Sequence, residues 1–171
     1  LAAALIMAMA RSLLHSAIAP GRRAEDVLAE VNDGLARDLE GQRLPYFLTL
    51  ALAVYDPSDR SLVVAGGGHN PVLIVGDDGV RELPSRGAAL GVRTGLRFPE
   101  DAVALPEGTT VALYTDGLTE ARDPDGDLYG LSRLKQSLAR CHGRPVRETL
   151  AGVWGDIAAF RGSGRPTDDA T

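Results

Sequence analysis

Apolar positions near the N-terminus recur at helical spacing. Residues of one apolar stripe return every three to four positions, namely Leu1, Leu5, Ile6, Met9, Leu13 and Ala17. This spacing predicts a helix that ends at Pro20-Gly21, because proline cannot continue the hydrogen-bond ladder. A second stripe predicts another helix over residues 24–39, with Glu25 and Asp26 in its first turn, where the helix dipole favours anions. The two helices are expected to form a hairpin that covers one face of a sheet.

The middle of the chain has the pattern of short strands separated by tight turns. β-branched, aromatic and aliphatic residues are concentrated in five segments, residues 46–55, 61–65, 72–75, 80–83 and 109–114. Asp56–Asp59 separates the first two segments and Gly76–Gly79 separates the next two, and both are typical turn sequences. Strands joined by such short turns must run antiparallel.

Two more helical patterns follow the strands. Leucines mark a third helix at residues 131–138, and apolar residues at helical spacing mark a fourth at residues 146–160. Helices, hairpin-joined strands and again helices are typical of an α+β fold with antiparallel sheets, not of an alternating βαβ fold.

Composition excludes several classes of protein. With 171 residues, the chain has the length of one globular domain, residues 1–171, and 44% hydrophobic with 24% charged residues excludes a disordered or fibrous protein. A net charge of -5 disfavours binding to nucleic acid or to an anionic membrane. The uncharged run Leu1–Ala10 is too short to span a bilayer and has no basic leader, so neither a membrane span nor a signal peptide is expected. A single cysteine, Cys141, permits no disulfide within the chain, which favours the reducing cytoplasm.

One candidate for chemistry is Asp116, which follows the predicted strand 109–114 and precedes Gly117. A carboxylate held rigidly at the end of a strand is well placed to bind a metal ion. Asp-Gly is also a common turn dipeptide, so the motif taken alone favours a structural interpretation.

A second candidate is the adjacent pair Asp168 and Asp169. Neighbouring carboxylates repel each other, which favours either a bound cation or a solvated surface loop. Together with Asp116 they would supply the oxygen ligands that suit Mg²⁺ or Mn²⁺ better than zinc.

A third candidate is the glycine-rich segment Gly66–Gly68, which precedes His69 and Asn70. Its glycines could direct backbone amides at a phosphate, but the segment matches neither a P-loop nor a dinucleotide-binding motif. His69 could donate a proton, or it could simply cap a turn. No G-x-S-x-G elbow is present, so an α/β-hydrolase triad has no support and no catalytic side chain is assigned.

The order of these motifs resembles that of the bacterial SpoIIE/RsbU-type serine phosphatases, which belong to the PP2C-like, metal-dependent PPM superfamily. The resemblance extends over essentially the whole chain and is most specific from Leu113 to Arg122. It is carried by Ala-Ala-Leu-Ile-Met near the start, Gly67–Pro71, Gly87–Val92, Tyr114–Ala121 and Asp168–Thr171.

The resemblance implies a PP2C-like α-β-β-α sandwich with two Mn²⁺ or Mg²⁺ ions. It also implies hydrolysis of phosphoserine or phosphothreonine on a protein by a metal-activated water. The metal ligands implied are Asp116 and Asp168, with Asp169 as a further neighbour, and His69 and Asn70 are expected to contact the substrate. The implied substrate is a STAS-type anti-sigma-factor antagonist, and a regulatory sensor domain is expected in the same polypeptide.

Two departures from the family leave an alternative open. Family members carry a D-x-x-G-x-G motif before the first helix and a final core strand after the D-D-x-T motif. This sequence starts at Leu1 and stops at Thr171, so we expect it to be a segment of a longer protein, with at most a partial metal centre. The alternatives are a pseudophosphatase that binds a phosphoprotein without hydrolysis and an unrelated structural domain.

Overall fold

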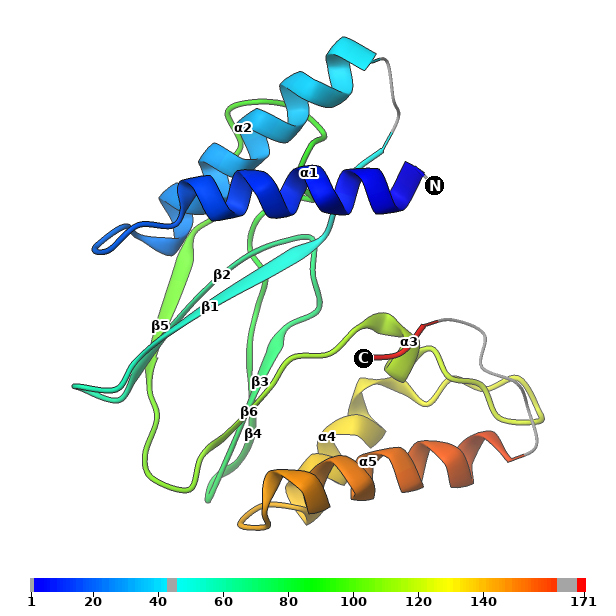
Figure 1. The fold of residues 1–171 in the computed structure, drawn as a ribbon. Coiled ribbons are helices and arrows are strands. Elements are labelled where there is room, and N and C mark those ends of the chain that lie inside the picture. The colour runs from blue at the N-terminus through cyan, green and yellow to red at the C-terminus, as the bar shows by residue number, and fades with distance from the viewer. Residues whose placement is uncertain (1, 43–45, 163–168) are drawn as a thin grey trace. The chain divides into compact units, whose positions relative to one another are not determined.

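The structure is a computed structural model that describes residues 2–42, 46–162 and 169–171. The chain forms two compact units, each described by itself below. The first comprises Leu1–His69 and Pro84–Leu105, and the second comprises Asn70–Leu83 and Pro106–Thr171. Figure 1 labels their helices and strands.

The first unit begins with the predicted helical hairpin. Helix α1 spans Ala2–Ala17 and helix α2 spans Ala24–Gln42. The apolar stripe of α2 is buried, with Leu28, Val31 and Leu35 at zero exposure, and it forms the centre of a core with Ile6 of α1 and Phe98. Helix α2 therefore lies between α1 and the rest of this core, as its period predicts.

The sheet of the first unit has the order β1-β2-β5 and is antiparallel. Its strands are β1 at Leu50–Asp56, β2 at Ser61–Gly67 and β5 at Glu100–Ala104. Strands β1 and β2 form the predicted hairpin, in which Asp56 pairs with Ser61. Before β1, Leu48 makes a bridge to Leu90, so the predicted strand over 46–55 is interrupted at its start.

Two glycines permit a close backbone crossing at the end of β2. Gly67 forms a parallel bridge with Gly87, and a Cβ on either residue would lie 2.3 Å from a side-chain atom, of Leu90 and Phe98 respectively. The Phe98 ring is buried at this crossing. Only glycine fits such a contact without displacing the ring.

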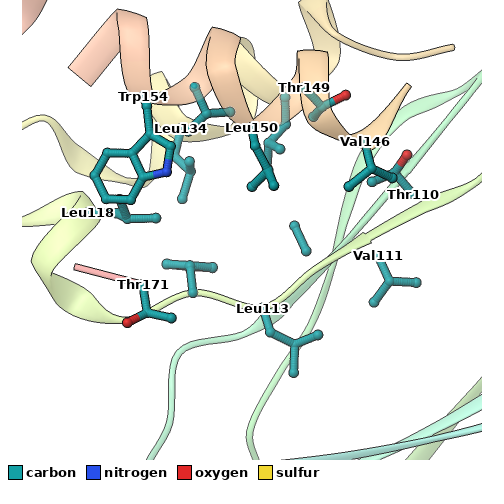
Figure 2. A pocket seen from close by; sticks show the side chains of 14 residues that line it. Thr110, Val111, Leu113, Leu118, Leu134, Val146, Thr149, Leu150, Trp154 and Thr171 are labelled. Carbon is teal, nitrogen blue, oxygen red and sulfur yellow. The ribbon is translucent and has the colours of Figure 1, made fainter. Parts of the chain in front are cut away.

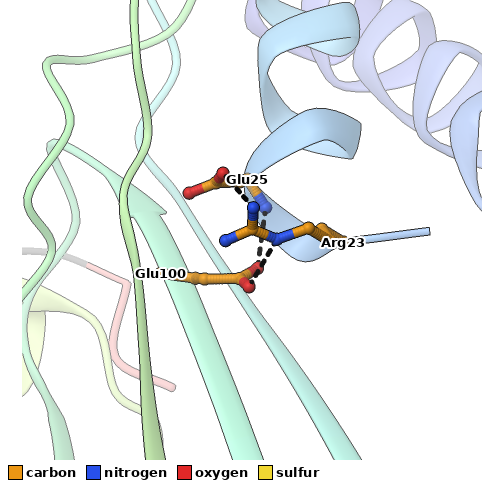
Figure 3. A network of polar contacts seen from close by, with 3 residues as sticks. All are labelled: Arg23, Glu25 and Glu100. Carbon is orange, nitrogen blue, oxygen red and sulfur yellow. Dashed lines mark hydrogen bonds and ion pairs between the residues drawn. The ribbon is translucent and has the colours of Figure 1, made fainter. Parts of the chain in front are cut away.

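Glu100 of β5 binds the N-terminus of α2 (Figure 3). Its carboxylate accepts a hydrogen bond from the backbone N–H of Glu25 at 3.3 Å and pairs with the Arg23 guanidinium at 3.0 Å. The first N–H groups of a helix lack partners within the helix, and a carboxylate there also suits the helix dipole. This contact fixes the start of α2 on the sheet.

Two polar side chains in the middle of α2 hold a loop of residues 91–95. The Asn32 side chain is fully buried; its amide oxygen accepts from the Gly91 N–H at 3.0 Å and its amide nitrogen donates to the Arg93 carbonyl at 2.9 Å. The neighbouring Asp33 carboxylate accepts from the Gly95 N–H at 2.8 Å. A buried amide with its oxygen and nitrogen both bonded stabilises the packing that it joins.

The sheet of the second unit has the order β4-β3-β6 and is also antiparallel. Strand β3 at Val72–Gly76 and β4 at Gly79–Leu83 form the second predicted hairpin. Strand β6 at Thr110–Ala112 is shorter than the predicted segment 109–114. The register would place Leu113 opposite Val72 and Tyr114 opposite Pro71, and proline has no N–H to continue the ladder.

Three helices complete the second unit: α3 at Asp116–Thr119, α4 at Gly130–Arg140 and α5 at Val146–Arg161. Leu134 and Leu138 of α4 and Val153 and Ile157 of α5 are buried in one core. Tyr129 and Phe160 meet edge to face in this core, with ring centroids 5.3 Å apart. The structure thus confirms the α+β class with two antiparallel sheets and adds β5 and α3, which the sequence pattern had not predicted.

Across the part of the chain that the structure describes, no helix combines the length and the apolar composition needed to cross a bilayer.

Replacing Asn32 with alanine is expected to lower the free energy of unfolding by about 2–3 kcal/mol, because it leaves buried backbone groups of the loop without partners. Urea denaturation would measure this loss. Asp38→Ala, at an exposed position of the same helix, is the matched control and should stay within about 0.5 kcal/mol of the wild type. Equal stabilities for the two variants would contradict the role given to Asn32.

Candidate functional site

Asp116 is the first residue of α3 and lies directly after the short segment that follows β6. The Tyr114 side chain is buried in the core of the second unit, and Leu118 of α3 is buried in the same core. Thr115 between them has extended backbone angles, with φ of -98° and ψ of 162°. These two apolar anchors fix the backbone on both sides of Asp116, whose side chain is exposed.

The last residues of the chain lie beside Thr115. The Thr115 hydroxyl donates to the Asp169 carbonyl at 3.3 Å and accepts from the Thr171 N–H at 3.0 Å. The Thr115 N–H donates to the Thr171 carbonyl at 3.1 Å. The structure therefore brings the T-D-G motif and the D-A-T end of the chain together, as their joint candidacy for a metal site requires.

Gly117 makes this approach possible. A Cβ at position 117 would lie 2.4 Å from the Asp169 carbonyl oxygen and 2.9 Å from its carbon. Both are backbone atoms, so no side-chain rotation could relieve the overlap. Glycine is needed here for close contact between two backbones, not for an unusual torsion angle.

Asp116 and Asp169 thus supply exposed carboxylates on two contacting segments. Asp168, the other ligand implied by the resemblance, lies outside the described residues. Among those described, no three acidic, histidine or cysteine side chains gather closely enough to hold an ion. Carboxylate oxygens such as those of Asp116 and Asp169 are the kind of donor that suits a hard cation such as Mg²⁺ or Mn²⁺.

His69 and Asn70 follow the end of β2, and both are half-buried. The backbone N–H of His69 donates to the Ser85 hydroxyl at 3.3 Å, and that of Gly68 donates to the Gly87 carbonyl at 2.8 Å. These amides are therefore used within the protein, and the structure favours a packing role for the glycines over a phosphate cradle. The His69 Nδ1 is buried without a hydrogen-bond partner among the described residues.

An apolar groove lies next to the Thr115–Thr171 contact within the second unit. It has a volume of about 170 Å³ and is lined by β6, by Leu113 and Tyr114, and by α4 and α5. Figure 2 shows Leu150 and Trp154 of α5 across the groove from Leu113, with Thr171 at its rim. Its lining is mainly aliphatic and aromatic, so it is suited to apolar side chains and not to a phosphate group.

Two residues of the site had no role assigned from the sequence. Thr115 and Thr171 form the junction, and neither had been predicted as a site residue. The available signal was a threonine in each motif, directly before Asp116 and two positions after Asp169, although Thr171 takes part through its backbone. A threonine in these motifs indicates a structural role only when its partner, far along the chain, is known.

Comparison with known proteins places this arrangement among related sequences. The family "Stage II sporulation protein E (SpoIIE)" matches residues 1–171. The protein IcfG of Synechocystis is 36% identical over 93 residues, which cover 54% of this chain and 15% of IcfG. Phosphoserine phosphatase RsbU of Bacillus subtilis is 26% identical over 128 residues, which cover 74% of this chain and 37% of RsbU. The chain therefore spans well under half the length of these curated relatives.

Among solved structures, the SiaA-PP2C domain of Pseudomonas aeruginosa superimposes with a TM-score of 0.85 at 25% identity. The match covers 98% of this chain and 67% of that domain's chain. The described fold is therefore PP2C-like.

Gly117→Ala should displace the Asp169 backbone and lower the affinity of the protein for Mn²⁺ by about tenfold or more. The reason is that the groups around a metal ligand determine where that ligand lies. Titration calorimetry with Mn²⁺ would measure the change. Gly155→Ala in α5 is the control, since a Cβ there meets no atom within 4 Å. Equal Mn²⁺ affinities for the two variants would contradict the requirement for glycine at position 117.

Burial raises the pKa of the Tyr114 hydroxyl to about 12, and the Glu82 carboxylate acts in the same direction. Below pH 10 the tyrosine is protonated in both folded and unfolded chains. Between pH 10 and 12 the unfolded chain loses this proton first, so stability should fall by an amount on the order of 2 kcal/mol. Denaturation across this range should show the extra loss in the wild type but not in Tyr114→Phe. Parallel pH profiles of stability for the wild type and Tyr114→Phe would contradict this prediction.

Proposed function

This chain belongs to the SpoIIE family, and we propose that it is the phosphatase domain of a longer protein that hydrolyses phosphoserine on a regulatory protein. The observation that carries the proposal is the junction at Thr115, which brings Asp116 and Asp169 to one place. The printed name of the Bacillus subtilis relative, a phosphoserine phosphatase, supports the choice of phosphoserine.

The PP2C-like family is typically metal-dependent, and the residues at the junction fit a metal. Asp116, Asp168 and Asp169 would hold Mn²⁺ or Mg²⁺ through carboxylate oxygens. The bound metal would supply a water acidic enough to ionise near neutral pH and positive charge facing the phosphoryl oxygens. The protein holds its own part of the site through α3, which fixes the Asp116 backbone, and through the Thr115 hydroxyl, which fixes the segment of Asp169.

The substrate is proposed to be a STAS-type anti-sigma-factor antagonist, which is the class that the family resemblance implies. His69 and Asn70 are the proposed substrate contacts. The buried, unpartnered Nδ1 of His69 supports a polar role for that ring, since an unsatisfied buried nitrogen destabilises the protein unless another group binds it.

The longer protein is proposed to complete the site and the sheet. Strand β6 has β3 on one side and no strand of the described residues on the other. The backbone of Thr171 is already bonded to Thr115, and the apolar groove extends from there along β6. A strand formed by residues beyond Thr171 would pair with this edge and place its side chains in the groove.

The same fold could serve a second function. A pseudophosphatase that binds a phosphoprotein without cleaving it is the alternative, because a fold does not by itself fix whether a bound substrate is cleaved. The two candidates differ in a single measurable step, the release of phosphate.

The full-length protein should release phosphate from a phosphoserine STAS-domain protein of the same genome when Mn²⁺ is supplied, and a chelator should abolish the release. Asp116→Asn should lower kcat by about a hundredfold or more and weaken Mn²⁺ binding, because one metal ligand loses its charge. Phosphate release and calorimetry measure the two effects.

Asp78→Asn in the exposed β3–β4 turn is the matched control and should retain wild-type activity. Residues 1–171 alone should be much less active than the full-length protein. If the full-length protein bound the phosphoprotein tightly but released no phosphate, the proposed phosphatase function would be wrong and the pseudophosphatase alternative would be supported.

A further inference from the structure

The loop 91–95 of the first unit is held at both ends and along its length. Gly91 is buried and bonded to Asn32, the Arg93 carbonyl is bonded to the same side chain, and Gly95 is bonded to Asp33. Beyond the loop, Phe98 is buried in the core. The backbone of this surface loop is therefore fixed by two side chains of α2, the buried Asn32 and the half-buried Asp33.

The side chains at the tip of the loop are exposed to solvent. Val92 is 61% exposed, and Arg93 and Thr94 are also exposed. Arg97, just after the loop, is exposed as well. A rigid backbone thus presents an apolar side chain between hydrogen-bonding and charged ones.

The charge of this segment is opposite to that of the whole chain. Residues 85–99 contain three arginines and no acidic residue, whereas the chain has a net charge of -5. Arg86 is paired with Asp101 at 2.7 Å. No hydrogen bond or ion pair of the Arg93 or Arg97 guanidinium exists among the described residues. Two unpaired guanidinium groups therefore remain available to an anionic partner.

Packing alone explains only part of this arrangement. The burial of Gly91 and the bonds to Asn32 would serve to close the core beneath the loop. They do not require an exposed valine at the tip or two unpaired arginines beside it. Loops that are ordered before binding lose less entropy when a partner docks, and arginine is enriched among the residues that dominate interfaces.

We propose that Val92, Arg93, Thr94 and Arg97 form a docking surface for the acidic face of the phosphoprotein substrate, held in shape by Asn32 and Asp33. The proposal rests on the phosphatase function proposed above and names a surface by which that substrate is recognised. The arginines would attract and orient an acidic protein, and Val92 would pack against an apolar residue at the centre of the contact. A small phosphate ester has no protein surface with which to contact these residues and serves as the reference substrate.

The test compares two substrates of the full-length protein, a phosphoserine STAS-domain protein of the same genome and p-nitrophenyl phosphate. In the double variant Arg93→Glu/Arg97→Glu, the ratio of kcat/KM for the STAS protein to kcat/KM for the ester should fall about tenfold or more. The fall should come from KM and not from kcat, and added salt should reduce the wild-type ratio more than that of the variant. Val92→Ser, which changes no charge, should lower the ratio in the same direction.

Arg37→Glu, at an exposed position of α2, reverses one charge away from the loop sequence and should leave the ratio at its wild-type value. An unchanged ratio in both loop variants, with normal folding, would overturn the docking surface while leaving the phosphatase function intact. Unchanged ratios with an altered sedimentation coefficient would assign the loop to self-association and also overturn the proposal. Absence of metal-dependent phosphate release by the wild type from either substrate would overturn the proposed function itself.

Discussion

The contact on which the candidate site depends is the one between the Thr115 hydroxyl and the backbone of Asp169 and Thr171. A single hydroxyl oxygen donates one hydrogen bond and accepts another, and both bonds join Thr115 to the same segment at the end of the chain. Gly117 completes the contact by leaving room for the Asp169 carbonyl. The acidic side chains of Asp116 and Asp169 are both exposed.

How much of the fold the sequence predicts depends on how local the determining interactions are. The two hairpins β1–β2 and β3–β4 were predicted correctly, since their turns lie within a few residues of the strands that they join. Strand β5 was missed because Glu-Asp-Ala-Val-Ala lacks a strand-like alternation, and its position is fixed by pairing with β2. Helix α3 was missed because it is a single turn held by Leu118.

The functional residues likewise divide into those marked by a local motif and those that depend on distant contacts. Asp116, Asp168 and Asp169 were singled out from their motifs, and the structure brings the segments of Asp116 and Asp169 together, while Asp168 lies outside the described residues. Nothing in the local sequence marks Asn32, because its partners Gly91 and Arg93 follow it by 59 and 61 positions. Helix α2 thus combines a periodic apolar stripe, visible in the sequence, with polar contacts that only the folded chain reveals.

The Thr115 junction also has a consequence for the order of folding. Thr115 and Asp169 are 54 positions apart, and both α4 and α5 lie between them. Closing a loop of that length costs chain entropy, which is recovered only once the intervening helices have packed. The junction is therefore expected to form late and to open early, so that amide hydrogen exchange at Thr171 would be faster than in the core of α5.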